Sequence, residues 1–281
     1  MSTKTKDSSL EKNPDLVRVL MIGDVVGKAG RDVLVKNLPE IRESRQIDFV
    51  IVNAENAAGG SGLTPDIYVA ILAAGTDCVT LGDHAFRQKS ILPILNSDDK
   101  RVVRPMNLPP EAPGRGWTVL DVPASGTRPA AKIGVLALLG RVFMQTQSDN
   151  PLLAADKALE RFSGVKIRFL DFHAEATSEK QIMGRYLDGR FSAVLGTHTH
   201  VATADEQIFP GGTAFQCDVG MTGAFDSIIG RKIEPVVEHF RTAKPATFDC
   251  ASGSPAINGA IVDVDPANGK ARQIRRLVYP V

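Results

Sequence analysis

The sequence lacks any long apolar segment. No stretch reaches the ~20 apolar residues of a membrane-spanning helix, and residues 1–15 are polar, without the apolar core of a secretion signal. Cysteine is also scarce, because the chain has three, far apart and odd in number, which does not fit a disulfide framework. We therefore expect a cytoplasmic protein with three core thiols and a disordered tail over residues 1–15.

An excess of charge of one sign is lacking too. Lys and Arg number 33 against 32 Asp and Glu, which leaves a formal net charge of +1. This balance exerts no long-range attraction on polyanions, so neither duplex nucleic acid nor a membrane is an expected partner. A chain of 281 residues with 43% hydrophobic content is typical of a globular protein. We predict one domain over residues 16–281, and the sequence leaves homo-oligomerisation open.

The sequence does contain a regular alternation of short Val- and Ile-rich runs with longer amphipathic segments. This pattern predicts strands separated by helices, and hence a layered α/β fold. The predicted helices cover residues 30–45, 64–75, 87–96, 150–162 and 178–189. The end of the chain, residues 259–281, predicts a closing β-hairpin around the turn DPANGK.

Five of the strand-like runs end in side chains that can bind metals. The runs finish at Asp24, at Glu55 and Asn56, at Asp83 and His84, at His173, and at His198 and His200. The carboxyl ends of strands in an open α/β sheet line one crevice, so these residues should meet in space. Carboxylates and imidazoles of this kind suit two metal ions about 3.5–4 Å apart.

The His198-Thr-His200 motif is informative because the chain has only five histidines. Residues i and i+2 of an extended segment point the same way, roughly 6.5 Å apart at the backbone, so the two imidazoles can reach two different ions. A single histidine at a strand end is more often structural. The metal-site interpretation therefore depends on four histidines occurring together, and we expect the fifth, His239, to lie on a helix without a chemical role.

Two other kinds of site are disfavoured by the sequence. The segment GDVVGKAG, residues 23–30, has neither the G-x-G-x-x-G pattern nor the Gly-Lys-Ser/Thr of a phosphate-binding loop. A zinc site built from cysteines needs closely spaced pairs, and the three cysteines are not spaced in that way.

Six sequence blocks resemble, in order and spacing, those of the bacterial YmdB-like family of 2′,3′-cyclic-nucleotide 2′-phosphodiesterases, within the calcineurin-like metallophosphoesterases. The blocks are GDVVGKAGR, NAENAAGGSGLT, RPMNLP, DFHAEATSEK, GTHTHVATAD and DVGMTG. The resemblance runs from about Val17 to the end of the chain. It implies a four-layered α/β/β/α fold and a centre of two divalent transition-metal ions, iron or manganese, with zinc as a competitor by raw affinity.

The resemblance also implies roles for individual residues. The ligands that it assigns to one metal, with the glutamate bridging, are Asp24, Glu55, Asn56 and His200. Those of the second metal are Asp83, His173 and His198. His84 matches the proton donor of the family. Arg104 and Asn107, in the block RPMNLP, are candidates for contacting the phosphate or ribose of a substrate, and a structural role for the arginine is an equal alternative.

The segment GDHAFR departs from the resemblance. The family usually has Gly-Asn-His followed by a hydrophobic residue and Asp, whereas Asp83 here replaces the asparagine and Arg87 stands where an acidic residue is expected. Aspartate is the better metal ligand, so metal binding is not endangered. An ionised aspartate cannot donate a hydrogen bond to phosphate, however, so rate and substrate preference are the properties that this departure affects.

The function implied by the resemblance is hydrolysis of 2′,3′-cyclic nucleotides to 3′-nucleotides. In the mechanism we expect, two cations lower the pKa of a bridging water to give a hydroxide, and His84 protonates the departing ribose oxygen. Two alternatives stay open. One is a metal-binding regulatory protein with weak or vestigial phosphodiesterase activity, and the other is a phosphodiesterase for other cyclic nucleotides or RNA ends.

Overall fold

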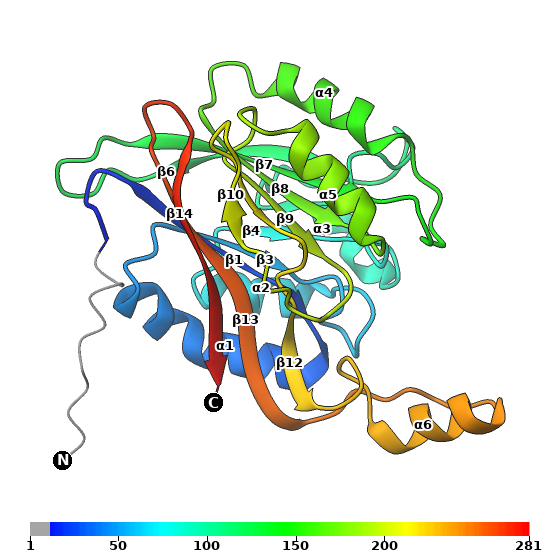
Figure 1. Cartoon of the computed structure of the whole chain (residues 1–281). Helices are drawn as coiled ribbons and strands as arrows, with labels where there is room; N and C mark the ends of the chain where they lie inside the picture. Colours follow the sequence, from blue (N-terminus) through cyan, green and yellow to red (C-terminus); the bar gives the residue numbers. More distant parts are fainter. Residues whose placement is uncertain (1–11, 281) are drawn as a thin grey trace, which may run out of the picture.

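The computed structural model of the protein describes residues 12–280 and shows two packed β-sheets flanked by helices (Figure 1). The strand order in the first sheet is β2 (Asp24–Val25), β12 (Met221–Asp226), β13 (Gly253–Val264), β1 (Val17–Ile22), β3 (Phe49–Asn53), β4 (Cys78–Thr80) and β5 (Val102–Val103), with β14 (Ala271–Pro280) paired to β13. The order in the second is β10 (Gln207–Ile208), β11 (Ala214–Gln216), β9 (Ala193–Thr197), β8 (Ile167–His173), β7 (Ala131–Leu139) and β6 (Trp117–Val122).

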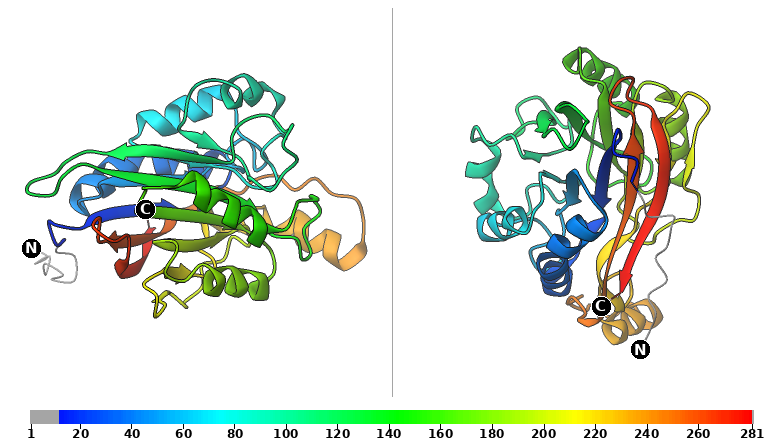
Figure 2. Two further views of the ribbon diagram at one scale, coloured as in Figure 1. Left: turned by 90° about the horizontal axis from the view of Figure 1, so that it is seen from above. Right: turned by 90° about the vertical axis from the view of Figure 1, so that its left-hand side faces the viewer.

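Helices cover the outer face of each sheet (Figure 2). Those packed on the first sheet are α1 (Gly27–Ser44), α2 (Pro65–Ala73), the 3₁₀ turn η2 (Lys89–Ile91) and α3 (Leu92–Leu95). Those packed on the second are α4 (Pro151–Arg161) and α5 (Thr177–Tyr186). The layer order is therefore α/β/β/α, and the predicted four-layered fold is confirmed.

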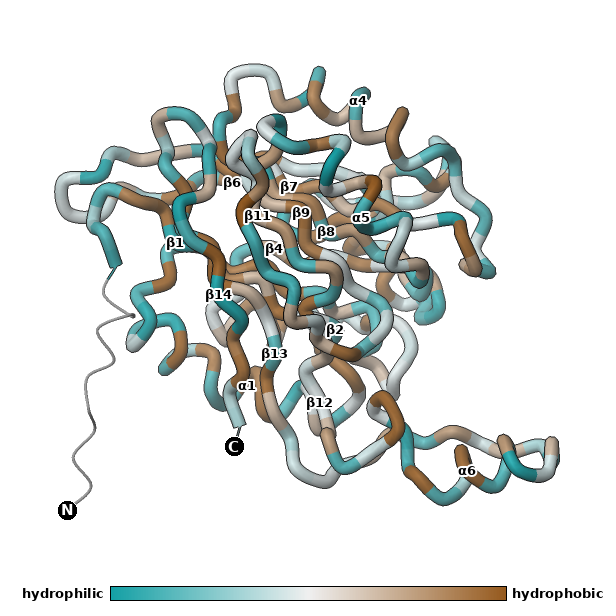
Figure 3. The backbone as a smooth tube through the Cα atoms, in the orientation of Figure 1, coloured by the Kyte–Doolittle hydropathy of each residue, from teal (hydrophilic) through white to brown (hydrophobic). Residues whose placement is uncertain are grey.

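Three buried apolar clusters fill the spaces between the four layers. On β1, Leu20 packs toward α1 while Val19 packs toward the second sheet. On β8, Phe169 lies between the two sheets while Leu170 packs toward α4 and α5. Because neighbouring strand residues point to opposite faces and both faces are covered, the central strands are mostly apolar, as the brown segments of Figure 3 show.

The strand directions bring the predicted site residues to one edge of the molecule. Within the first sheet, β1, β3 and β4 run parallel, and within the second β8 runs parallel to β9. Their carboxyl ends, where the polar runs begin, therefore lie close together. The C-terminal hairpin of β13 and β14 forms as predicted and pairs antiparallel with β1.

The segment 87–96, the three cysteines and His239 can each be compared with the prediction from the sequence. The helix predicted over residues 87–96 is only η2 followed by the single turn of α3, because Pro93 has no amide hydrogen with which to close an α-helical bond. Cys78 and Cys217 are buried as predicted, but Cys250 is only partly buried, so the prediction of three core thiols is wrong for that residue. His239 lies on a helix, as predicted.

That helix, α6 (Ile233–Thr242), contains no buried residue and projects from the body of the molecule (Figure 1). Residues 1–11 of the predicted tail lie outside the described residues, whereas Lys12 forms an ion pair with Asp48. No helix within residues 12–280 is both long and apolar enough to cross a membrane.

Candidate metal centre

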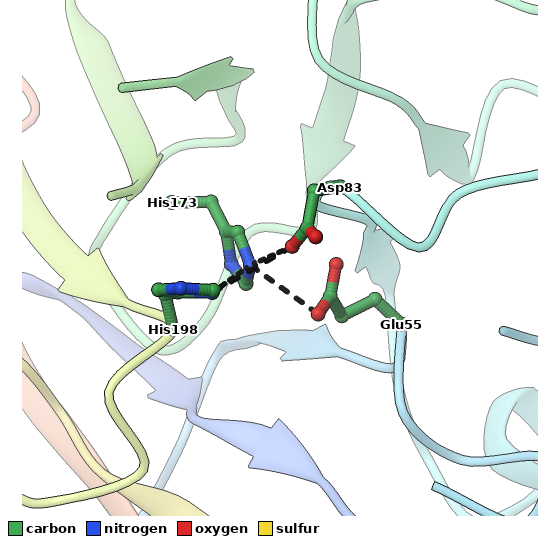
Figure 4. A group of neighbouring side chains, drawn as sticks. All are labelled: Glu55, Asp83, His173 and His198. Carbon is green, nitrogen blue, oxygen red and sulfur yellow. Dashed lines mark hydrogen bonds and ion pairs between the residues drawn. The ribbon is translucent and has the colours of Figure 1, made fainter. Parts of the chain in front are cut away.

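Four side chains from four strand ends point toward one another (Figure 4). Glu55 follows β3, Asp83 follows β4, His173 ends β8 and His198 follows β9. One nitrogen or oxygen from each of the four lies within 4.8 Å of those of the other three. Two carboxylates and two imidazoles at this spacing form a set of donors that suits a transition-metal ion.

His173 lies at the centre of this cluster and is fully buried. Its Nε2 is 3.2 Å from Glu55 Oε1, 3.1 Å from Asp83 Oδ1 and 3.0 Å from Nδ1 of His198. Burial opposes a charge on His173, but Glu55 and Asp83 outweigh burial and raise the pKa of the imidazole well above its ordinary value. A positive charge is therefore strongly favoured at this point.

Glu55 and Asp83 are in turn stabilised in their ionised form by His173. Burial alone would raise the pKa of Glu55 and of Asp83, yet the adjacent His173 leaves both below their ordinary values. Both side chains are thus ionised at neutral pH, which is the form that binds a metal ion.

Asp24 is fully buried beside this cluster and has an unsatisfied oxygen. Its Oδ2 accepts the backbone N–H of His198 at 3.1 Å, while Oδ1 has no hydrogen-bond donor. Burial raises the pKa of Asp24 to about 6, against the opposing effects of His173 and His200. A buried carboxylate oxygen without a donor is costly, so a cation at this position would satisfy it.

Asn56 and His200 lie on the Asp24 side of the cluster. The amide Nδ2 of Asn56 is 3.0 Å from Glu55 Oε1 and 3.2 Å from His200 Nε2. Nδ1 of His200 is 2.9 Å from the carbonyl oxygen of Ile229, which can only accept, so the ring proton lies on Nδ1. The lone pair of Nε2 therefore faces the cluster. All seven predicted ligands thus lie in one contact network, of which four form the tight group.

His84 borders the same network but remains partly accessible. Its Nδ1 is 2.7 Å from Asn56 Oδ1, and its backbone N–H donates to Glu55 Oε2 at 3.1 Å. The other ring nitrogen, Nε2, is 3.6 Å from Asp83 Oδ2, and the side chain is 26% exposed. The His84 side chain is therefore accessible from solvent at the border of the network.

Buried polar residues that the sequence analysis did not select orient His173. The hydroxyl of Thr197 lies 2.8 Å from His173 Nδ1 and donates to Asp171 Oδ1 at 2.6 Å. Because the Thr197 proton goes to Asp171, its oxygen accepts the Nδ1 proton of His173, and Nε2 is left for a metal. Asp171 Oδ2 also accepts from Asn53 and Thr80. Asn53 and Asp171 are polar residues within mainly apolar strand runs, and this was the feature of the sequence from which they could have been selected.

His198 faces the cluster with Nδ1, whereas His173 faces it with Nε2. Its Nε2 lies 3.2 Å from Glu175 Oε2, another residue that the sequence analysis did not select. Burial and the neighbouring His173 lower the pKa of His198 to about 4, so the ring is neutral at pH 7. With Nε2 next to the Glu175 carboxylate, Nδ1 of His198 faces the cluster, 3.0 Å from His173 Nε2.

The glycine of the GDHAFR segment leaves room for the cluster. A Cβ added to Gly82 would lie 2.2 Å from Glu55 Oε2 and 2.4 Å from His173 Cδ2. Any larger residue would therefore displace two members of the cluster. Arg87, the other departure in this segment, is exposed.

Arg104 and Asn107 are not part of the cluster. The Arg104 guanidinium is buried and donates to the carbonyl oxygens of Pro105 and Ala112, at 2.7 and 3.1 Å. Asn107 exchanges two hydrogen bonds of 2.8 Å with the backbone of Leu139. These contacts favour the structural alternative for Arg104, and contact of Asn107 with a substrate stays a prediction.

A four-layered fold with carboxylates and histidines at its strand ends is typical of metal-dependent phosphoesterases. The family model described as YmdB-like protein matches residues 20–277, and the chain belongs to this family. It is 43% identical to the 2′,3′-cyclic-nucleotide 2′-phosphodiesterase of Bacillus subtilis, over 93% of this chain and 97% of that protein.

Two solved structures show the same fold. A hypothetical protein of Thermus thermophilus superposes with a TM-score of 0.86 at 40% identity, covering 94% of this chain and 99% of that one. A novel phosphatase of Mycoplasma pneumoniae superposes with a TM-score of 0.86 at 32% identity, covering 94% of each chain.

The contact between Thr197 and His173 can be tested by removing one oxygen. Thr197→Val should weaken binding of Mn²⁺ by roughly 10–100-fold, because the Nδ1 proton of His173 loses its acceptor. Thr118→Val is the matched control, since the Thr118 hydroxyl is buried without a hydrogen-bond partner and lies on β6. Titration of both variants with Mn²⁺ against a competing chelator measures the difference. Equal affinities would show that the Thr197 hydroxyl does not orient the ligand.

Metal binding should also depend on pH. The raised pKa of His173 means that Nε2 holds a proton at neutral pH in protein stripped of metal, so an ion that binds Nε2 must displace it. Affinity should therefore increase as pH rises from 6 to 8, by up to about tenfold per pH unit, with proton release. Calorimetry in buffers of different ionisation enthalpy measures the released protons. A constant affinity without proton release would contradict this prediction.

Proposed function

We propose that the protein is a binuclear metal-dependent phosphodiesterase that hydrolyses 2′,3′-cyclic nucleotides to 3′-nucleotides. The observation that carries this proposal is the group of Glu55, Asp83, His173 and His198 within 4.8 Å, beside the unsatisfied buried oxygen of Asp24. The similarity to the Bacillus subtilis phosphodiesterase, which extends over 93% of the chain, supports the substrate class.

The residues present fit two cations that share Glu55. We assign one ion to Asp24, Glu55, Asn56 and His200, and the other to Glu55, Asp83, His173 and His198. Iron or manganese suits this mixed set of oxygen and imidazole donors, with zinc competing by affinity. Such ions, when bound, supply Lewis-acid activation of water and neutralise charge on the phosphoryl oxygens.

His84 is the residue we assign as the general acid. Its Nδ1 is fixed by the Asn56 amide, and its partly exposed Nε2 is free to approach a leaving oxygen. If Asn56 binds a cation through Oδ1, its amide must turn so that Nδ2 faces His84. Nδ1 of His84 then accepts a hydrogen bond, and the proton of a neutral ring moves to Nε2, the nitrogen that an acid at this position uses.

Asp83 supports a second candidate function, that of a regulatory metal-binding protein. Its carboxylate, where the family usually has asparagine, adds a negative charge next to His173 and His198. Three carboxylates reduce the net positive charge that would attract an anionic diester, which favours a regulatory metal-binding protein with weak activity.

The three cysteines are all free thiols, which supports the cytoplasmic location that we also propose.

A substrate panel with metal analysis tests the proposed function. We expect about two transition-metal ions per chain and hydrolysis of 2′,3′-cyclic AMP, with 3′-AMP as the product and 3′,5′-cyclic AMP a poor substrate. A chelator should abolish hydrolysis, and the double variant His198→Ala/His200→Ala should lose metal, whereas the control His239→Ala should not.

Each failure in this panel has a distinct meaning. Full metal content in the His198→Ala/His200→Ala protein would overturn the metal site. Bound metal without hydrolysis of any cyclic nucleotide would favour the regulatory function. Preference for 3′,5′-cyclic AMP, or release of 2′-AMP, would overturn the proposed substrate or bond specificity.

Substrates with different leaving groups test the role of His84. His84→Ala should retain both metals and lose ~10²–10⁴-fold in kcat on 2′,3′-cyclic AMP, whose ribose oxygen needs a proton to leave. Hydrolysis of bis-p-nitrophenyl phosphate should decline far less, because nitrophenolate leaves without protonation. Equal losses on the two substrates would make His84 a positioning residue instead of the acid.

A further inference from the structure

The segment that carries His198 and His200 has an unusual backbone. Both histidines lie in the left-handed region, with φ of 102° and 65°. Residues other than glycine adopt this conformation at a cost in free energy, and they keep it only where the surrounding structure holds them in place. The contacts of the intervening Thr199 therefore help to hold the backbone of both histidines in place.

Asp218 makes those contacts. The Asp218 carboxylate is 1% exposed, and its Oδ2 accepts both the backbone N–H of Thr199, at 3.0 Å, and the Thr199 hydroxyl, at 2.8 Å. Its Oδ1 accepts the backbone N–H of Gly220 at 2.8 Å. One buried carboxylate thus fixes the peptide between the two histidines to the loop after β11.

Lys180 provides the counter-charge. Its Nζ lies 2.8 Å from Asp218 Oδ2, and the side chain is 2% exposed. Lys180 lies on α5, the helix that follows His173, so the pair connects the segment after β8 with the loop after β11 that holds Thr199. The metal-ligand assignment gives no role to either residue, although Lys180 ends the block DFHAEATSEK and Asp218 begins the block DVGMTG.

Stability alone does not account for a pair of this kind. Burying two opposite charges costs desolvation energy that their attraction often fails to offset, and apolar residues of similar size commonly serve a core as well. The chain has a second buried pair for comparison, in which Arg18 Nε lies 2.7 Å from Asp263 Oδ1. That pair joins β1 to β13 at the amino end of β1, away from the metal-ligand cluster.

We propose that Lys180 and Asp218 are positioning residues that hold Thr199 so that His198 and His200 face the two metal positions. This inference deepens the proposed function and depends on it. Neither residue touches a metal ion or substrate. Their effect passes through the backbone of Thr199, and the ion pair with Lys180 holds the Asp218 carboxylate against that backbone.

Paired substitutions at the two buried ion pairs test the proposal. Lys180→Met and Asp218→Asn are compared with Arg18→Met and Asp263→Asn at a temperature where circular dichroism shows each protein folded. Mn²⁺ titration against a chelator gives the affinity, and the paramagnetic resonance spectrum of bound Mn²⁺ reports the ligand geometry. We expect the first two variants to bind Mn²⁺ at least about tenfold more weakly, with an altered spectrum. The controls should lower Tm while leaving affinity within about twofold.

Two further variants keep the test decisive if a single variant does not fold. Lys180→Met/Asp218→Asn removes both charges, so it should recover Tm without recovering Mn²⁺ affinity. Thr199→Val should lose part of the affinity through the hydroxyl contact alone. Variants at 180 and 218 that lower Tm yet bind Mn²⁺ like wild type, with an unchanged spectrum, would overturn the positioning role. Wild-type protein that binds no Mn²⁺ would instead overturn the proposed metal centre.

Discussion

Buried negative charge at one edge of the two sheets is the constraint on which the rest of this structure depends. Asp24 and Glu55 are fully buried, and Asp83 lies next to them. Carboxylates removed from water need hydrogen-bond donors or positive charge. The chain supplies imidazoles and backbone N–H groups, including those of His84 and His198. Even so, one oxygen of Asp24 has no donor, and a cation at this position would satisfy it.

The three imidazoles among the proposed metal ligands follow one rule with three kinds of partner. His173 uses a threonine hydroxyl backed by a carboxylate, His198 uses an exposed carboxylate, and His200 uses a backbone carbonyl. In each case one ring nitrogen is occupied by its partner, which leaves the other nitrogen directed at the cluster. The orientation of the rings is thus determined by residues outside the ligand set.

The sequence predicted the metal-ligand positions that come directly after a strand in the chain. Ligands placed directly after parallel strands must meet at one edge, so the positions of residues such as Glu55, Asp83 and His173 follow from the strand pattern alone. Contacts across the space between sheets depend on register, which one sequence does not provide. The bond between Asn53 and Asp171 joins residues 118 positions apart on opposite sheets. The same limit applies to Arg104 and Asn107, because the sequence does not reveal the backbone partners that the structure gives their side chains. Contact of these two residues with a substrate stays a prediction. Roles for the ligands and for His84 remain predictions, because the geometry brings these residues together without testing what each one does.

The proposed donors divide by type between the two halves of the sandwich. Every oxygen donor, from Asp24 to Asp83, follows a strand of the first sheet, and every nitrogen donor, from His173 to His200, belongs to the second. Oxygen donors alone suit hard ions such as magnesium or calcium, whereas imidazoles alone lack the charge to hold two cations closely. The proposed selectivity for a transition metal is therefore a property of neither half alone. It arises only when the two sheets are correctly packed together. Binding of a transition metal would therefore indicate that the chain has folded completely.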